Sequence, residues 1–215
     1  MASIDRRERE RLETRTRIMD AARDLFAREG YDAVSMRRLA EAIEYSPTAI
    51  YVHFEDKQDL LLQICQCDFL SMAEGMTDLQ KVADPVERIR RMGSAYIRFG
   101  VEHPNHYRLM FMTPVEFPPD AAAKDPNKGN VDRSSYALLR RTCEEAIERG
   151  RIRPEYRDAD LVAQTFWSAV HGVASLHIVK SGSPWIDWKG VEPLATTVVD
   201  GILRGMVANE QEARP

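Results

Sequence analysis

The sequence is poor in the residues that mark disulfide-bonded, collagen-like or disordered chains. Its 215 residues include three cysteines, none in a C-x-x-C pair, and eleven each of glycine and proline. Disulfide scaffolds and zinc ribbons pair or cluster their cysteines, and collagen-like or disordered chains contain far more glycine and proline. We therefore expect a globular protein of a reducing cytoplasm, large enough to bury a core.

Charge of one sign and long apolar runs are also scarce. The formal net charge of −4 excludes a globally basic nucleic-acid coat, so any contact with DNA must be local. The longest uncharged segment, residues 161–179, contains Gln164, Thr165, Ser168 and two histidines, which would be costly in hydrocarbon. The first twenty residues lack the apolar stretch of a signal peptide. We expect no membrane span and no export.

Catalytic and metal-binding motifs are missing as well. The chain has no G-x-S-x-G, H-E-x-x-H, P-loop or G-x-G-x-x-G pattern, which are the motifs that would place a nucleophile, a zinc ion or a phosphate. His103 and His106 are three residues apart, but Pro104 interrupts the helix that would put them on one face. We expect no catalytic site, no metal and no cofactor.

Helical periodicity is the dominant pattern, and it predicts an all-α fold of about nine helices. Ile18, Ala22, Leu25 and Phe26 repeat at three- and four-residue steps before Gly30, which predicts a helix over 14–29. Residues 113–130 contain four prolines and are expected to form a mobile loop. The other helices are expected after Ser35, after Ser46, and near 56–78, 85–102, 107–111, 131–149, 159–180 and 191–208.

The first sixty residues predict a helix-turn-helix. Two short helices, capped by Ser35 and by Ser46 followed by Pro47, are separated by a tight turn and supported by the preceding longer helix. In such a unit the second short helix can enter the major groove of DNA. Its helical spacing divides it into a reading face with Thr48, Tyr51 and Val52 and a packing face with Ala49, Ile50 and Phe54.

Residues 18–60 resemble the DNA-binding domain of TetR-family transcriptional regulators. The resemblance lies in four blocks, Ile18–Tyr31, Ser35–Ala40, Ser46–Phe54 and Lys57–Leu60. It implies an all-helical homodimer with a three-helix head at 1–57, a larger ligand-binding and dimerisation body at 58–210, and a tail at 211–215. It also implies a regulator, most commonly a repressor, that a small-molecule effector releases from an inverted-repeat operator in double-stranded DNA.

The resemblance also implies which residues contact DNA. Arginine can pair with guanine, whereas hydroxyls, a helix N-terminus and lysine suit phosphate oxygens. The competing interpretations are that Arg37 is a solvated charge, Tyr51 a core aromatic and His53 a surface imidazole, and that Arg38 pairs with Glu41 on the same helix. The predicted DNA contacts are Arg15, Arg17, Ser35, Arg37, Ser46, Pro47, Thr48, Tyr51, His53 and Lys57.

Two features depart from the family pattern. Glu44 occupies the turn position that is usually glycine, where a positive φ costs a side chain on the order of 1 kcal/mol. Residues 1–57 hold eleven Lys and Arg against twelve Asp and Glu, so non-specific affinity for DNA is expected to be modest and weakened by salt. The arginine-rich segment 6–17 offers a compensating contact, or else forms a frayed, charge-balanced end.

The body carries candidate effector contacts rather than catalytic ones. Residues 167–172 read W-x-x-x-H-G, which resembles the signature of one C-terminal subfamily of these regulators. Aromatic and methionine side chains with a few polar tips suit an apolar ligand, although the same stripes also suit a plain core. The predicted effector contacts are Tyr96, Phe99, Tyr107, Met110, Trp167 and His171.

The last two helices predict a homodimer. The first is apolar nearly all round, and the second has an apolar stripe at Val191, Leu194, Val198, Ile202 and Met206, so one side of each should meet a second copy. Two other classes of protein are open alternatives. One is an enzyme or small-molecule carrier with a vestigial helix-turn-helix, and the other is a protein-interaction module, for which the acidic head is the only support.

Overall fold

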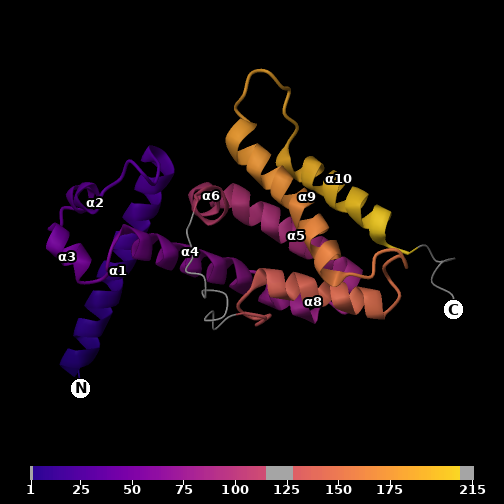
Figure 1. The fold of residues 1–215 in the computed structure, drawn as a ribbon, viewed down its shortest axis with the longest axis horizontal. Helices are drawn as coiled ribbons and strands as arrows, with labels where there is room; N and C mark the ends of the chain where they lie inside the picture. The colour runs from indigo at the N-terminus through magenta and orange to yellow at the C-terminus, as the bar shows by residue number, and fades with distance from the viewer. Residues whose placement is uncertain (1, 115–127, 209–215) are drawn as a thin grey trace. The chain divides into compact units, whose positions relative to one another are not determined.

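The computed structural model describes residues 2–114 and 128–208, with side chains from residue 6 onward. Within these ranges the chain is all-α, as expected, and has one isolated antiparallel bridge between Ile152 and Val207 but no β-strand. The predicted loop 113–130 lies mostly outside the described residues, and the tail 211–215 lies wholly outside them. The elements are α1 Ala2–Glu29, α2 Met36–Ala42, α3 Pro47–Tyr51, α4 Lys57–Glu74, η1 Thr77–Lys81, α5 Pro85–Glu102, α6 Pro104–Met112, α8 Ser135–Glu148, α9 Ala159–Lys180 and α10 Val191–Met206 (Figure 1).

The chain divides into two compact units. The head unit comprises Met1–Asp68 and Asn105–Glu116, and the body unit comprises Phe69–Pro104 and Phe117–Pro215. The predicted boundary at residue 57 is the first residue of α4, whereas the division between the units falls between Asp68 and Phe69, within the same helix. Most of α6, which was expected in the body, is grouped with the head unit.

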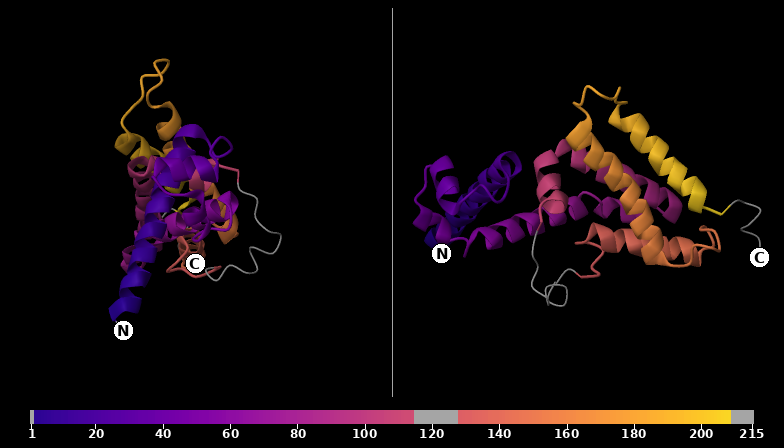
Figure 2. Two further views of the ribbon diagram at one scale, coloured as in Figure 1. Left: turned by 90° about the vertical axis from the view of Figure 1, so that its left-hand side faces the viewer. Right: turned by 45° about the horizontal axis from the view of Figure 1, so that its top comes forward.

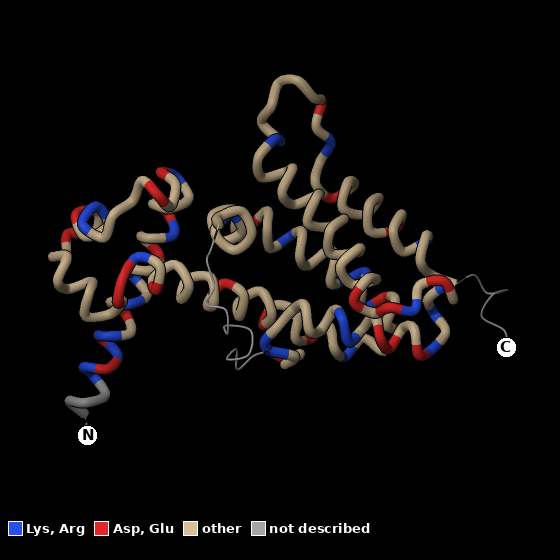
Figure 3. Tube along the Cα trace, in the orientation of Figure 1, with Lys and Arg blue, Asp and Glu red and all other residues tan. Residues whose placement is uncertain are grey.

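Helix α1 is longer than the periodicity predicted. The apolar pattern begins only at Ile18, so the sequence predicted a helix over 14–29, whereas the helix starts at Ala2. Its first half alternates arginines with carboxylates (Figure 3), and Arg6 pairs with Glu10, one turn along the helix, at 2.8 Å. Such pairs four residues apart stabilise a helix by a few tenths of a kcal/mol each, so the first half of α1 can be helical without an apolar stripe.

Two other expected helix ends also differ. The fourth helix ends at Glu74 rather than near residue 78, because Gly75 follows and the chain continues as the 3-10 helix η1. The predicted helix from 131 begins at Ser135, where the Ser134 hydroxyl accepts a hydrogen bond from Ala137 N at 3.2 Å. No helix in the described ranges combines the length and the hydropathy that a membrane crossing needs.

A buried ion pair links α1 to α4 in the head unit. Arg23 on α1 donates to both carboxylate oxygens of Asp68 on α4, at 3.1 and 2.8 Å, and both side chains are buried. His106 on α6 places Nδ1 3.1 Å from the same carboxylate. Arg23 also donates to the exposed Asp20 at 2.6 Å. A single carboxylate therefore joins three helices that are far apart in the sequence.

Helix α9 is the centre of the body unit. It packs against α5, α8 and α10 (Figure 2), which explains why its sequence is apolar on more than one side. Gly93 on α5 allows the closest approach, because a Cβ atom at this position would lie 2.6 Å from the ring of Phe166 on α9 and 3.1 Å from Val199 on α10. Gly93 was not among the residues predicted from the sequence.

The buried ion pair predicts unequal effects of two similar substitutions. Asp68→Asn leaves the buried Arg23 guanidinium with only the exposed Asp20 as a counter-charge, so we expect it to lower the free energy of unfolding by about 3 kcal/mol. Asp20→Asn removes a partner whose side chain is 62% exposed, and we expect a loss below about 1 kcal/mol. Urea unfolding followed by far-UV circular dichroism measures both, and equal losses would contradict the assignment.

Candidate nucleic-acid interface

The turn between α2 and α3 keeps the left-handed geometry that glycine usually provides. Glu44 has φ of +58°. The Tyr45 amide donates to the Ala40 carbonyl at 2.9 Å and the Glu44 amide donates to the Glu41 carbonyl at 3.4 Å, which together form a Schellman motif. The departure from glycine therefore costs stability at Glu44 without changing the type of turn that directs α3.

Serine hydroxyls cap both short helices. Ser35 Oγ accepts from the Arg38 amide at 3.1 Å, and Ser46 Oγ accepts from the Ala49 amide at 3.2 Å, with Pro47 in the first turn of α3. Each hydroxyl keeps a proton to donate, and each helix N-terminus carries partial positive charge. Both features suit an anionic oxygen such as that of a phosphate.

Helix α3 has the two faces that its spacing predicted. Ile50 and Phe54 are buried in the head, while Thr48 is exposed and Tyr51 leaves 52% of its surface exposed. The interpretation of Tyr51 as a core aromatic is therefore wrong. The outer face offers a phenol and a hydroxyl for hydrogen bonds to base edges or phosphates.

The two arginines of α2 have different partners. Arg37 pairs with Glu41 at 3.2 Å and its side chain is 82% exposed, so the guanidinium can exchange this partner for DNA at little cost. Arg38 pairs with Glu29 of α1 at 3.0 Å. The predicted pair between Arg38 and Glu41 is therefore wrong. Glu41 pairs instead with Arg37, which lies four residues before it on the same helix.

Two of the predicted phosphate contacts are engaged within the head. Arg15 donates to the His53 carbonyl at 3.2 Å and stands 4.8 Å from the centre of the Phe54 ring. Lys57 donates to the Tyr31 carbonyl at 2.9 Å and its Nζ lies 4.2 Å from the Tyr31 ring centre. The two cations fix the end of α3 and the start of α4, a positioning role that the sequence analysis did not assign.

His53 closes the recognition segment as a neutral imidazole. Partial burial, with the positive charges of Arg11 and Arg15, lowers the pKa of His53 below its usual value. It can therefore act near neutral pH as a hydrogen-bonding group rather than as a cation. The predicted DNA contacts that lie exposed on the head are Arg17, Ser35, Arg37, Ser46, Pro47, Thr48 and Tyr51.

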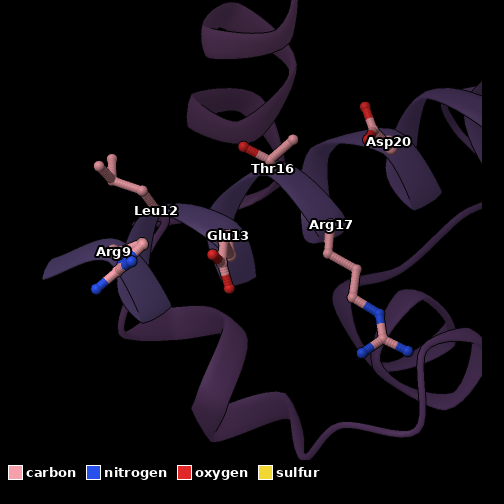
Figure 4. Close-up of a pocket in the computed structure, with 6 residues that line it drawn as sticks. All are labelled: Arg9, Leu12, Glu13, Thr16, Arg17 and Asp20. Atoms are coloured by element: carbon pink, nitrogen blue, oxygen red, sulfur yellow. The ribbon is translucent and has the colours of Figure 1, made fainter. Parts of the chain in front are cut away.

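A hollow lies along α1 beside these residues. Its volume is about 460 Å³, and every lining side chain comes from α1 (Figure 4). Arg17 on this face also stands 5.7 Å from the ring centre of Tyr45, the residue that follows the strained turn. None of the predicted effector contacts lines this hollow. Its lining residues are Arg9, Leu12, Glu13, Thr16, Arg17 and Asp20.

The body unit brings together three of the predicted effector contacts. Tyr96 Oη lies 3.0 Å from His171 Nδ1, and the Trp167 ring meets the His171 ring edge-on at 6.4 Å. Tyr136, which the sequence analysis missed, adds its ring at 5.8 Å from Trp167 and donates to Asp160 at 3.0 Å. We name these four aromatic side chains, Tyr96, Tyr136, Trp167 and His171, the aromatic cluster.

The other predicted effector contacts lie elsewhere. Phe99 is half-buried beside His103 at a ring distance of 5.2 Å. Tyr107 and Met110 are buried in α6 within the head unit, where the Tyr107 ring lies 4.8 Å from that of Phe111. Among the side chains that the structure describes, no group of three or more His, Cys, Asp or Glu residues is arranged to hold a metal ion.

The strained turn predicts that Glu44→Gly stabilises the protein. Glycine removes the steric cost of positive φ but loses more entropy on folding, so we expect a net gain of roughly 0.5–1 kcal/mol in the free energy of unfolding. Glu44→Ala is the matched control, since it removes the charge and keeps the Cβ atom. A gain in the alanine variant equal to that in the glycine variant, measured by urea unfolding, would show that charge and not backbone strain is the cause.

Burial of His171 predicts a pH-dependent stability. Burial lowers the pKa of His171 in the folded protein, so the unfolded chain binds a proton more readily below its pKa of about 6.5. The stabilising contribution is present above that pH and is lost as the pH falls through the folded pKa. We expect the wild type to lose more stability than His171→Gln between neutral pH and about pH 5.5 in urea unfolding. Parallel losses would contradict this.

Comparisons with known proteins give the same fold and the same kind of head. The family model "Bacterial regulatory proteins, tetR family" matches residues 18–64, and the model "Tetracyclin repressor-like, C-terminal domain" matches residues 89–202. The chain is 25% identical to the TetR family transcriptional regulator PfmR from Thermus thermophilus, whose structure superposes with a TM-score of 0.66 over 87% of this chain and 97% of that one.

Curated relatives match over shorter lengths. The chain is 40% identical over 65 residues to the transcriptional repressor AcnR of Corynebacterium glutamicum, which covers 30% of this chain and 35% of AcnR. It is 30% identical over 114 residues to the transcriptional activator FasR of Mycolicibacterium smegmatis, covering 52% of each. The chain thus spans about a third to a half of the length of these relatives, which are regulators and not enzymes. Because the two family models together match most of its length, the chain belongs to the TetR family of bacterial regulatory proteins.

Proposed function

We propose that this protein is a DNA-binding transcriptional regulator that acts as a homodimer in the cytoplasm and responds to a small molecule. The observation that carries the proposal is the division of α3 and the residues that follow it, in which Ile50 and Phe54 are buried while Thr48 and Tyr51 are exposed. The outer face of a helix so arranged is available to a DNA major groove. The matching family models support the same function.

The contacts on the head indicate how DNA would be held. The capped N-termini of α2 and α3 and the Arg17 guanidinium suit phosphates, and Tyr51, Thr48 and Arg37 suit base edges. Because the head carries no net positive charge, we expect few phosphate contacts beyond these. Non-specific binding would then be weak, and specificity would depend on the short α3 and on the pairing of two heads.

The outward faces of α9 and α10 support the homodimer. Leu176 and Val179 on α9 are at least half exposed. Gly172 on α9 and Gly201 and Gly205 on α10 have open space where a Cβ atom would stand. A second pair of helices can approach closely at such glycines, and a two-fold contact of four helices would bury these apolar groups.

The aromatic cluster supports an effector site in the body unit. It combines apolar ring faces with the Tyr96–His171 hydrogen bond and the Tyr136–Asp160 hydrogen bond, which suits an apolar ligand with a polar end. Effector and DNA would favour different separations of the two heads, so each would weaken the binding of the other, typically by 1–3 kcal/mol. We propose repression relieved by the effector, although the named relatives include both a repressor and an activator.

We expect Tyr51→Ala and Arg37→Ala to weaken specific DNA binding at least tenfold each, since both remove exposed groups that suit base edges. Gel retardation on duplexes selected from a random library measures this, and sedimentation checks that self-association is unchanged. Arg28→Ala, at an exposed arginine on α1 that donates to the Asp24 carbonyl of the same helix, is the matched control.

Specific binding retained by both variants would show that α3 does not read DNA. Turnover of a ligand without DNA binding would favour the enzyme or carrier alternative. Capture of a protein partner that survives nuclease and competitor DNA would favour an interaction module.

A further inference from the structure

The loop between α9 and α10 carries an exposed aromatic side chain that the proposed function does not use. Trp185 leaves 89% of its surface exposed, and Ile186 beside it leaves 55%. Residues 181–190, which we name the aromatic arm, extend beyond the ends of both helices (Figures 1 and 2). Adjacent large apolar side chains at the tip of a projecting loop are typical of a contact surface.

The arm is shaped by contacts of its own. The Ser183 amide donates to the Lys180 carbonyl at 2.8 Å, and Lys189 pairs with Asp187. Trp188 is half-buried, with its indole nitrogen covered and without a hydrogen-bond partner among the described residues. One indole of the arm is thus turned inward while Trp185 is left in water.

We propose that Trp185 and Ile186 pack on a second copy of this chain, around Leu161 at the N-terminal end of the partner's α9. The inference rests on the proposed homodimer and adds to it a contact at the edge of the four-helix surface. Leu161 is 58% exposed, although it lies in the first turn of α9, the helix at the centre of the body unit. Each copy would then offer one arm and one receiving surface, as a two-fold contact requires.

An antiparallel pairing of the two α9 helices brings these groups together. The uncovered Gly172 is the position where the helices can cross most closely. From there, Leu161 lies eleven residues, or about 16 Å, toward the N-terminus, and Lys180 lies eight residues, or about 12 Å, toward the C-terminus. The arm continues beyond Lys180, so residues near its tip reach the level of the partner's Leu161. In a parallel pairing the helices would end together, and the arm would find only the other arm.

The surface area that a stable dimer must bury also favours a second copy of this chain as the partner of the arm. The outward positions of α9 and α10 include Ser168, Gly172, Gly201 and Gly205, small residues that bury little surface. A specific interface buries about 800 Å² on each partner, and a tryptophan this exposed adds roughly 200 Å². The arm would supply about a quarter of the required area at the edge of the same face.

Sedimentation velocity of the full chain tests the proposal. We expect Trp185→Ser and Leu161→Ser each to raise the dimer dissociation constant at least tenfold, because each removes one side of a buried apolar contact. The double variant should have a dimer dissociation constant close to that of the single variant with the larger effect, since both changes remove the same contact. Ser181→Ala, at an exposed position of the same arm whose hydrogen bond is made by its backbone amide, is the matched control and should leave the constant within about twofold.

Fluorine NMR of protein labelled with 5-fluorotryptophan gives a second measurement, with Trp185→Phe assigning the resonance. We expect the Trp185 signal to be shielded from a soluble paramagnetic agent in the dimer and exposed in the monomer. A stable dimer that tolerates Trp185→Ser and leaves the resonance exposed would overturn the arm contact while the homodimer stands. A wild-type chain that stays monomeric at micromolar concentration would overturn both.

Discussion

The proposed function depends on the burial of Ile50 and Phe54. Helix α3 has five residues, too few to be stable in water without tertiary contacts. These two side chains hold it in the head, and Arg15 fixes its end by donating to the His53 carbonyl at 3.2 Å. Because the apolar side packs against the rest of the head, the side with Thr48 and Tyr51 faces solvent. The specificity of the head is therefore a consequence of its core.

The head in turn depends on contacts between segments that are distant in sequence. Asp68 accepts hydrogen bonds from Arg23 and faces His106, so one buried carboxylate fixes α1, α4 and α6. Removing one partner of a buried ion pair is strongly destabilising, so the helices that carry these groups are coupled through Asp68. Since α4 continues into the body unit, this pair lies on the covalent route along which an effector signal would reach α1.

Local patterns in the sequence predicted most of the fold but few of these pairings. Helical periodicity gave the all-α class, and the serines and glutamate around the short helices gave the caps and the strained turn that the structure has at Ser35, Ser46 and Glu44. The Arg23–Asp68 pair spans forty-five residues and has no local signal. The family resemblance predicted that Lys57 contacts a phosphate. It did not predict that Lys57 donates to the Tyr31 carbonyl at 2.9 Å, because the two residues are distant in sequence. Tyr136 was missed because its neighbours in space come from α9.

The central claim is that two α3 helices, related by two-fold symmetry, read one duplex. The most direct measurement is selection of bound duplexes from a random library, followed by sequencing. The account predicts a shared inverted repeat whose half-site centres lie about 10 base pairs apart, or a multiple of that spacing, since the two recognition helices must reach successive turns of the same groove. Recovered duplexes that share no sequence, or only a single unrepeated site, would contradict it.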